Sequence, residues 1–561
     1  MSGLGRKGWG IRTARLSAAI LAVGAMVTGC GVDLSASSSF EPGQAQLNPQ
    51  PRENLRDGGT LTTALTEVTP QWNAFQADGT AYTLSLWRWY NPVLAFFTPD
   101  GVYSFNRDYL TDVKKAVDGG KTVVTYTINP RATYNDGMPI DWRAFENTWR
   151  VSRGTDPAFV ASSTDGYDQI ESVTRGVDDK QAVVRFRGIW AWPDGLFNTL
   201  LHPKVATAED FNRSYIQNPH PELGAGPYTV ASYDRNAGIV VFERNPRWWG
   251  KRGKLDRRVF RQMEPQAGIN AFRNGELDAT GVGSKDYRAQ VVTMTGIDVR
   301  VSATPAISLL VLNLDTPVLR DPRVRQALLD GIDRATLARI RFTGLGYTEE
   351  LPGSFLLFPF QPGYRNNVGS TITYDQDRAR RLLDEAGWVG DGIRHRADHP
   401  DQRLTLSLPI LGDDATSTNI ARAMQAMLRQ IGIDLAITVR PTSDFSKVVV
   451  GKEFDVFMMG YASSDPYGVA YLCQIWCANS QLNRSGAGTP ELDAQIRGVQ
   501  QIPEPDAQIA AANDVEAKAF GQFSNLPLFN GPTMVAVKKG LANYGAGMFY
   551  VGPVEDIGWE K

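Results

Sequence analysis

Short apolar runs separated by turns predict β-strands over much of the chain. The clearest run, Lys121 to Ile128, is rich in β-branched residues and follows the turn at 118–120 (Asp-Gly-Gly). β-branched and aromatic side chains pack well on a pleated surface and favour strands. By the same reasoning we expect strands at 59–65, 182–186 and 239–242.

Amphipathic helices alternate with these strands. Asp321 and Pro322 are typical of a helix start, with aspartate as the N-cap and proline in the first turn. A second helix is predicted at 375–386, because Gly387 provides a common helix stop. The clearest apolar stripe has helical spacing and precedes a predicted strand at 433–439; it comprises Ile420, Ala423, Met424, Met427, Leu428 and Ile431.

Alternating strands and helices are typical of an α/β fold. The chain has 561 residues, more than one hydrophobic core usually serves, so we expect at least two lobes. No internal repeat of fixed period is visible in the sequence.

The amino-terminal end has the features of a secretory signal peptide. Four cations, Arg6, Lys7, Arg12 and Arg15, precede the apolar run Leu16 to Val27, which is too short to cross a bilayer core of ~30 Å. The run ends at Val27-Thr28-Gly29-Cys30, which resembles a bacterial lipobox. We therefore expect residues 1–29 to be a lipoprotein signal peptide and Cys30 to be lipidated. The alternative is a chance cysteine after an ordinary signal peptide.

Residues 30–57 are rich in Ser, Pro, Gln, Asn and Gly, and we expect a flexible tether there. The folded body is then predicted to lie outside the cell, on the outer face of the cytoplasmic membrane. The formal net charge is −2, and removal of the cationic leader makes the chain more acidic. This charge argues against nucleic acid as a partner.

Catalytic and cofactor motifs are missing from the sequence. No G-x-S-x-G, H-E-x-x-H or G-x-x-x-x-G-K-[ST] occurs, and Thr229 breaks the dinucleotide fingerprint that Gly224-Ala225-Gly226 begins. His395 and His399 have the spacing of a two-histidine metal face, but their polar surroundings favour solvated loop residues over a weak metal contact. We expect no enzyme, no cofactor and no metal site.

Cys473 and Cys477 are four residues apart. Outside the cell this spacing favours a local disulfide if the segment is not a regular strand. A redox-active pair is the alternative, although such pairs more usually have the spacing C-x-x-C.

Many short motifs, in order, resemble family 5 of the extracellular solute-binding proteins, which includes the dipeptide- and oligopeptide-binding components of ABC importers. Each motif alone is weak, but their shared order over nearly the whole mature chain is specific. They are GGTLTTAL (58–65), the segment 130–147, Gly226-Pro227-Tyr228, RNPRWW (244–249), GELD (275–278), Leu312-Asn313-Leu314, DPRVRQA (321–327) and the helix 374–387.

The resemblance implies a two-lobed α/β fold of the type II periplasmic-binding-protein class, with an extra subdomain in the first lobe. Mapped onto this chain, lobe I comprises 58–93, 209–305 and 523–561. The extra subdomain comprises 94–208, and lobe II comprises 306–522. The two crossings between the lobes, near 305 and 523, would form the hinge.

The resemblance also implies a ligand site between exposed strand edges of the two lobes. In the family's peptide binders one edge lies just after the first strand, here Glu67, Val68 and Thr69. The other lies at a Gly-Trp segment, here Gly460, Tyr461 and Ala462. Such edges pair with a peptide backbone by β-augmentation. The alternative is that both are ordinary strand ends.

An aspartate shortly after Gly-Trp binds the peptide ammonium in the relatives, but this chain departs from that pattern. Ser464 occupies the corresponding position, and Asp465 follows one place later. Asp465 is a candidate for amine capture; alternatively it starts a turn with Pro466. Tyr467 is a further candidate for lining the pocket.

The resemblance implies a monomeric peptide receptor that delivers its ligand to an ABC permease and ATPase and is held at the membrane by a lipid anchor. Oligosaccharide, haem or a metal chelate are alternative ligands. A non-transport envelope lipoprotein with a lost site is an alternative of another class, favoured slightly by Ser464. A hydrolase is a third, for which no nucleophile constellation is present.

Overall fold

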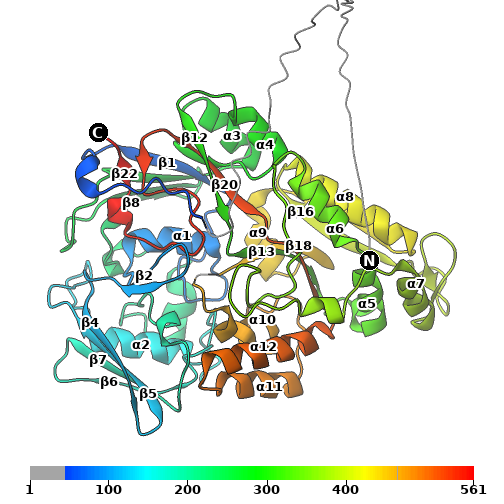
Figure 1. Cartoon of the computed structure of the whole chain (residues 1–561), viewed down its shortest axis with the longest axis horizontal. Helices are drawn as coiled ribbons and strands as arrows, with labels where there is room; N and C mark the ends of the chain where they lie inside the picture. The colour runs from blue at the N-terminus through cyan, green and yellow to red at the C-terminus, as the bar shows by residue number, and fades with distance from the viewer. Residues whose placement is uncertain (1–43, 464) are drawn as a thin grey trace, which may run out of the picture. The chain divides into compact units, whose positions relative to one another are not determined.

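The computed structural model describes residues 44–463 and 465–561. Its largest sheet has seven strands in the order β12-β20-β11-β1-β10-β9-β8 (Figure 1). The central strand β1 (Thr60–Leu65) runs parallel to β10. The other strands are β8 (Tyr228–Asp234), β9 (Ile239–Arg244), β10 (Arg257–Gln262), β11 (Ala279–Gly281), β12 (Ile297–Ala303) and β20 (Pro532–Lys538). These bounds confirm the strands predicted at 59–65 and 239–242.

An aromatic core packs against the seven-stranded sheet. The helix α1 (Ala81–Tyr90) begins at a capping box formed by Thr80 and Thr83, which satisfies backbone N–H groups at the helix start. It buries Trp87 and Tyr90 in one apolar cluster with Phe242.

A four-stranded antiparallel sheet, in the order β4-β5-β7-β6, forms a separate layer. Its strands are β4 (Leu110–Asp118), β5 (Lys121–Ile128), β6 (Ile170–Arg175) and β7 (Gln181–Phe186), and α2 (Trp142–Ser152) packs on β6 and β7 (Figure 1). The strand β5 confirms the strand predicted at 121–128, and its residues alternate between half-buried and buried. Nearby, β2 (Ala95–Phe97) and β3 (Tyr103–Phe105) pair as a hairpin.

Residues 306–529 form the third part of the fold. Here β13 (Ala306–Leu312) lies between β18 (Val456–Ala462) and β19 (Asn525–Phe529), while β16 (Thr405–Leu411) pairs in parallel with β17 (Asp434–Arg440). The helices are α5 (Pro322–Asp330), α6 (Arg334–Phe342), α7 (Gln376–Glu385), α8 (Ala415–Gln430), α9 (Phe445–Val450), α10 (Leu472–Trp476), α11 (Pro490–Gln500) and α12 (Pro505–Phe520). The predicted start of α5 at Asp321 and Pro322 and the predicted helix at 375–386 are confirmed, and the apolar stripe that begins at Ile420 lies in α8.

The largest buried apolar cluster surrounds these helices and reaches α3 (Pro265–Arg273) and α4 (Lys285–Val291) beside the seven-stranded sheet. Two short antiparallel pairs complete the strands. They are β14 (Trp388–Val389) with β15 (His395–Arg396), and β21 (Leu541–Ala542) with β22 (Gly558–Trp559).

The chain crosses twice between the seven-stranded and three-stranded sheets. The first crossing joins β12 to β13, and the second joins β19 to β20. Because β19 pairs with β13, strand pairing places the second crossing at 530–531 rather than at the expected 523. Asn530 Nδ2 donates to Ala306 O at 2.8 Å and so connects the two crossings.

Glu349 holds the second crossing from the side. Its carboxylate accepts the backbone N–H groups of Asn530 and Gly531 at 2.7 and 2.8 Å. Gly531 has φ of +79°, a left-handed conformation that favours glycine.

Residues 44–57 are bound to the folded body. The expectation of a flexible tether at 30–57 is therefore wrong for this part of the segment. Gln46 N donates to Ala546 O at 2.8 Å, Leu55 is buried, and Arg52 Nη1 donates to Glu555 O at 2.9 Å. The polar composition misled because this segment gains its partners from the far end of the chain. The signal peptide, Cys30 and the rest of the tether lie outside the described residues.

We expect Asp330→Ala to destabilise the protein, because α5 and α7 are joined by a buried carboxylate. Arg378 donates Nε to Asp330 Oδ2 at 2.8 Å and Nη2 to Oδ1 at 2.7 Å, and Asp330 has 0% exposure. The loss in free energy of unfolding should be about 2–3 kcal/mol, measured by urea denaturation, since Arg378 is partly exposed.

The matched control is Asp377→Ala, which removes an exposed partner of Arg380 on the same helix. It should change the free energy of unfolding by less than about 0.5 kcal/mol. Equal effects of the two substitutions would contradict the assigned role of Asp330.

Candidate functional site

The segment Glu67-Val68-Thr69 follows β1 and is buried. Val68 N donates to Gln262 Oε1 at 2.8 Å, so its N–H group is already satisfied within this part of the fold. Glu67 Oε2 accepts Thr69 Oγ1 at 3.1 Å. The sequence predicts a strand edge at this segment. One of its backbone donors, the N–H of Val68, already donates to the side chain of Gln262.

The side chain of Glu67 reaches the start of α9. Ser446 donates its Oγ to Glu67 Oε2 at 2.9 Å and its backbone N to Oε1 at 3.3 Å. Burial raises the pKa of Glu67, although the hydrogen bonds from Ser446 oppose this shift.

A second glutamate makes the same kind of contact. Glu264 precedes α3, but its side chain accepts the backbone N and Oγ1 of Thr442, at 2.8 and 2.9 Å. Thr442 Oγ1 also lies 3.3 Å from Thr66 O. We call Glu67, Glu264, Thr442 and Ser446 the carboxylate clasp. The sequence carries no local signal for it, because its partners lie hundreds of residues apart.

The segment Gly460-Tyr461-Ala462 lies in β18, an edge strand. These residues pair on one side with Ser308, Ile307 and Ala306 of β13. Gly460 and Ala462 are exposed. Because β18 ends the three-stranded sheet, its other side is a strand edge of the kind to which an extended chain can add.

Asp465 lies directly after β18 and is almost fully buried, with 1% exposure. Its Oδ1 accepts Tyr467 N at 2.9 Å, which is a turn of the kind that Asp and Pro favour. Its Oδ2 accepts Tyr471 OH at 2.6 Å. The turn role is therefore present, and amine capture by Asp465 stays a prediction. Ser464 lies outside the described residues.

Arg88 of α1 provides a positive charge near Asp465. Burial lowers the pKa of Arg88, and the negative charge of Asp465 opposes this shift. Tyr467 packs its ring against Trp192, with centroids 5.7 Å apart, and against Phe97 at 6.1 Å. Tyr467 thus lies against Phe97 and Trp192, and Asp465 lies near Arg88 of α1.

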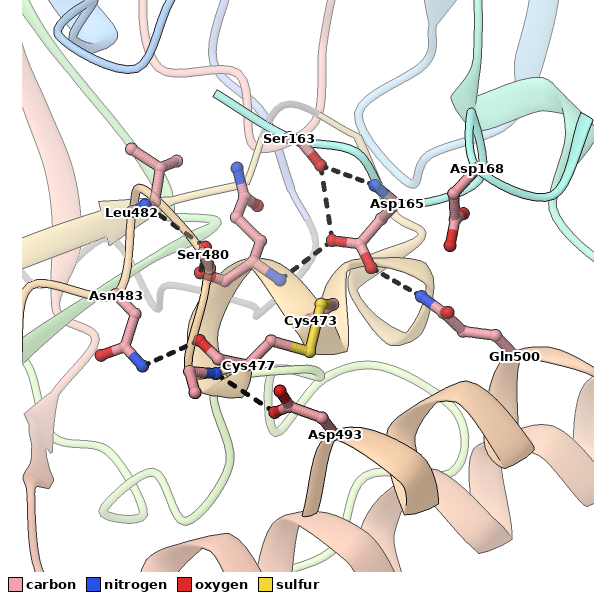
Figure 2. The surroundings of a disulfide bond; sticks show 12 residues. Ser163, Asp165, Asp168, Cys473, Cys477, Ser480, Leu482, Asn483, Asp493 and Gln500 are labelled. Atoms are coloured by element: carbon pink, nitrogen blue, oxygen red, sulfur yellow. Dashed lines mark hydrogen bonds between the residues drawn. A yellow bond between two sulfur atoms is a disulfide. The ribbon is translucent and has the colours of Figure 1, made fainter. Parts of the chain in front are cut away.

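A disulfide joins Cys473 and Cys477 on the single turn of α10, so the segment is not a strand. Figure 2 shows this bond beside the carboxylate of Asp165, which comes from the segment between α2 and β6.

Within residues 44–463 and 465–561, no cluster of three or more His, Cys, Asp or Glu side chains is arranged to hold a metal ion. No helix in the same residues has the length and apolar content needed to cross a membrane.

Comparison with known sequences identifies relatives over most of the chain. Residues 109–483 match a family described as bacterial extracellular solute-binding proteins, family 5 Middle. The oligopeptide-binding protein OppA of Mycobacterium tuberculosis H37Rv is 33% identical over 541 residues, which cover 94% of this chain and 90% of OppA.

Solved structures share the fold at lower identity. The oligopeptide-binding protein AppA of Bacillus subtilis, in complex with a nonapeptide, superposes with a TM-score of 0.77 at 17% identity, covering 90% of this chain and 100% of AppA. NikZ of Campylobacter jejuni, in complex with Ni(L-His), gives 0.72 at 17% identity, covering 91% and 100%. The fold is the two-lobed α/β class of type II periplasmic binding proteins, as expected from the sequence motifs.

The carboxylate clasp predicts a local change in hydrogen exchange. In Glu264→Ala the backbone N–H of Thr442 loses its acceptor, so its exchange rate should rise about tenfold. Hydrogen exchange followed by mass spectrometry measures this rate. Glu276→Ala, which removes an exposed partner of Arg261, is the control and should leave Thr442 unchanged. Equal protection of Thr442 in both variants would refute the clasp.

Proposed function

Because the chain belongs to family 5 of the bacterial extracellular solute-binding proteins, we propose that it captures peptides between two lobes and delivers them to the permease of an ABC importer. The free edge of β18 is the observation that carries this proposal. Gly460 and Ala462 are exposed there, and an extended peptide can add to such an edge whatever its side chains are.

The proposed lobes follow the two large sheets. Lobe I contains the seven-stranded sheet, with the four-stranded sheet in the extra subdomain at 94–208, and lobe II contains the three-stranded sheet. The crossings at 304–305 and 530–531 form the proposed hinge, which Glu349 and Asn530 brace.

Ligand binding is proposed to favour the closed arrangement of these lobes. The carboxylate clasp joins residues of lobe I to residues 442–446 of lobe II. A peptide that contacts both lobes only when they are closed would shift the balance toward that arrangement. The closed form would then dock on the permease, whose ATPase drives transport.

The proposed location is the outer face of the cytoplasmic membrane. Acylation of Cys30 would hold the protein there, with residues 31–43 as the connection to the described body. The proposed receptor acts as a monomer. The proposed role is binding rather than catalysis, because the matching family is described as solute-binding proteins and OppA as an oligopeptide-binding protein.

A second candidate function is that of an envelope lipoprotein without transport activity. Ser464 stands where peptide-binding relatives have the amine-binding aspartate, and this departure favours the alternative. A metal chelate, haem or an oligosaccharide are further ligand classes within the transport role.

Native mass spectrometry of the purified protein distinguishes these functions. A mixture of co-purifying peptide masses is expected for a peptide receptor. A uniform ligand-free mass, unchanged after incubation with a tryptic peptide mixture, would overturn the transport proposal. A single non-peptide adduct would assign another ligand class.

Asp465→Asn tests the charge proposed to receive the peptide ammonium. Loss of the carboxylate should weaken binding of a peptide from the co-purifying mixture by about 1.5–3 kcal/mol, or about 10- to 150-fold in Kd. Isothermal titration calorimetry measures this change. Asp315→Asn, which alters an exposed partner of Lys452, is the control. An unchanged Kd with intact folding removes the amine-binding role from Asp465.

A further inference from the structure

A buried carboxylate connects the proposed extra subdomain to the helices that follow β18. Asp165 has 3% exposure. Its Oδ2 accepts the backbone N of Gln474 at 2.9 Å, and its Oδ1 accepts Gln500 Nε2 at 2.6 Å (Figure 2). Gln474 belongs to α10 and Gln500 to α11. Asp165 therefore fastens one segment of the subdomain to two helices more than 300 residues away in sequence.

Reciprocal contacts strengthen this junction. Gln474 Nε2 donates to Ser162 O at 3.4 Å, so Gln474 uses both its backbone and its side chain toward the same segment. Ser163 Oγ lies 3.4 Å from Asp165 Oδ2 and orients the carboxylate from its own side. A carboxylate buried in this way stabilises a contact only while its donors stay in place.

The donor of the main hydrogen bond lies on a helix too short to be stable alone. The helix α10 spans Leu472–Trp476, and isolated helices below about 12 residues are marginal in water. The disulfide links Cys473 and Cys477, directly on either side of the 474–476 turn. Cys477 N also donates to Cys473 O at 2.9 Å. The covalent bond thus fixes the turn that carries the Gln474 N–H.

We propose that Asp165, Gln474, Gln500 and the Cys473–Cys477 disulfide form a redox-sensitive latch between the extra subdomain and lobe II. With the disulfide intact, the Gln474 N–H points at Asp165 and the junction is closed. With the disulfide reduced, the short helix frays and the junction loosens. The latch bears on ligand capture only if the proposed two-lobed binding function holds.

The reductant in this proposal is a dithiol. Its thiolate attacks Cys473 Sγ, because Cys473 is partly exposed whereas Cys477 is 1% exposed. The sulfur–sulfur bond breaks, Cys477 leaves as a thiolate, and a mixed disulfide forms at Cys473. The second thiolate of the reductant then attacks the first sulfur of the same reductant in that mixed disulfide, and Cys473 leaves as a thiolate. Two protein thiols and one oxidised dithiol result, so electrons and protons balance.

Asp165 also makes the latch sensitive to acid. Burial is the main cause that raises the pKa of Asp165, and the nearby negative charge of Asp168 raises it further, to about 7. Tyr471 faces Asp165 from the turn before α10, and Ser163, the backbone N–H groups of Cys473 and Gln474 and the side-chain amide of Gln500 also interact with its carboxylate. A released Asp165 regains its ordinary, lower pKa, so the latched state binds the proton more tightly. The latch is therefore stronger below pH 7 and weakens as pH rises through 7.

Hydrogen exchange of the full-length protein tests the latch without any ligand. Reduction with dithiothreitol, followed by thiol alkylation, should raise exchange about tenfold in both 160–169 and 470–476. Asp165→Ala with the disulfide intact, which removes both acceptor oxygens, should raise exchange in the same two segments. The double variant Cys473→Ser/Cys477→Ser should show the same exchange as the reduced protein, and dithiothreitol should not change its exchange.

Asp493→Asn is the matched control, because Asp493 accepts the N–H of Ala478 just after the disulfide. It should affect exchange at 477–479 and leave 160–169 unchanged. Full reduction, verified by alkylation of both Cys473 and Cys477, with unchanged exchange at 160–169 would overturn the latch. Chemical reduction of the folded protein keeps this test valid if the double variant does not fold.

Two further measurements complete the test. The wild-type exchange rate at 160–169 should rise between pH 6 and pH 8 beyond the intrinsic chemical rate, and Asp165→Asn should remove this excess. A pH-independent excess would overturn the acid sensitivity. Native mass spectrometry of the same samples separates the peptide-capture proposal from the latch proposal. If no peptide is bound but the exchange at 160–169 still depends on the redox state, peptide capture is refuted and the latch is supported.

Discussion

Buried and half-buried carboxylates that accept backbone N–H groups hold distant parts of this chain together. Glu67 and Glu264 bind the segment 442–446, Glu349 binds the crossing at 530–531, and Asp165 binds α10. A carboxylate loses hydration when it is buried, so each contact is favourable only while its donors are present. The geometry of the proposed cleft thus depends on a few polar contacts rather than on shape alone.

This arrangement gives the junctions a reversible character that an apolar core lacks. The largest apolar cluster continues from lobe II into α3 and α4, and interdigitated packing of that kind resists sliding. The carboxylate contacts, by contrast, can exchange protein donors for water at modest net cost. Opening is therefore expected to separate the clasp and the Asp165 junction while the packing around α3 and α4 moves as a unit.

Sequence reasoning succeeded where the signal is local. Asp321 and Pro322 specify the start of α5, and the β-branched run Lys121 to Ile128 specifies β5, because capping and β-propensity act within a few residues. It failed where the partner is remote. The strand β19 pairs with β13 of the three-stranded sheet, whereas residues from 523 on were expected in lobe I. The clasp could not be predicted, because the local sequence around each glutamate is like that of a surface residue.

The bound amino-terminal segment has a mechanical consequence. Residues 46–55 run beside the carboxyl-terminal strands, with bridges from Gln46 to Ala546 and from Leu55 to Glu560. A pull on the leading end of the chain would first load these contacts together with the Arg52–Asp556 ion pair. Tension from any attachment upstream would therefore act first on the contacts between residues 46–55 and the carboxyl-terminal strands, and on β12 through the hydrogen bond from Val301 N to Gln46 Oε1.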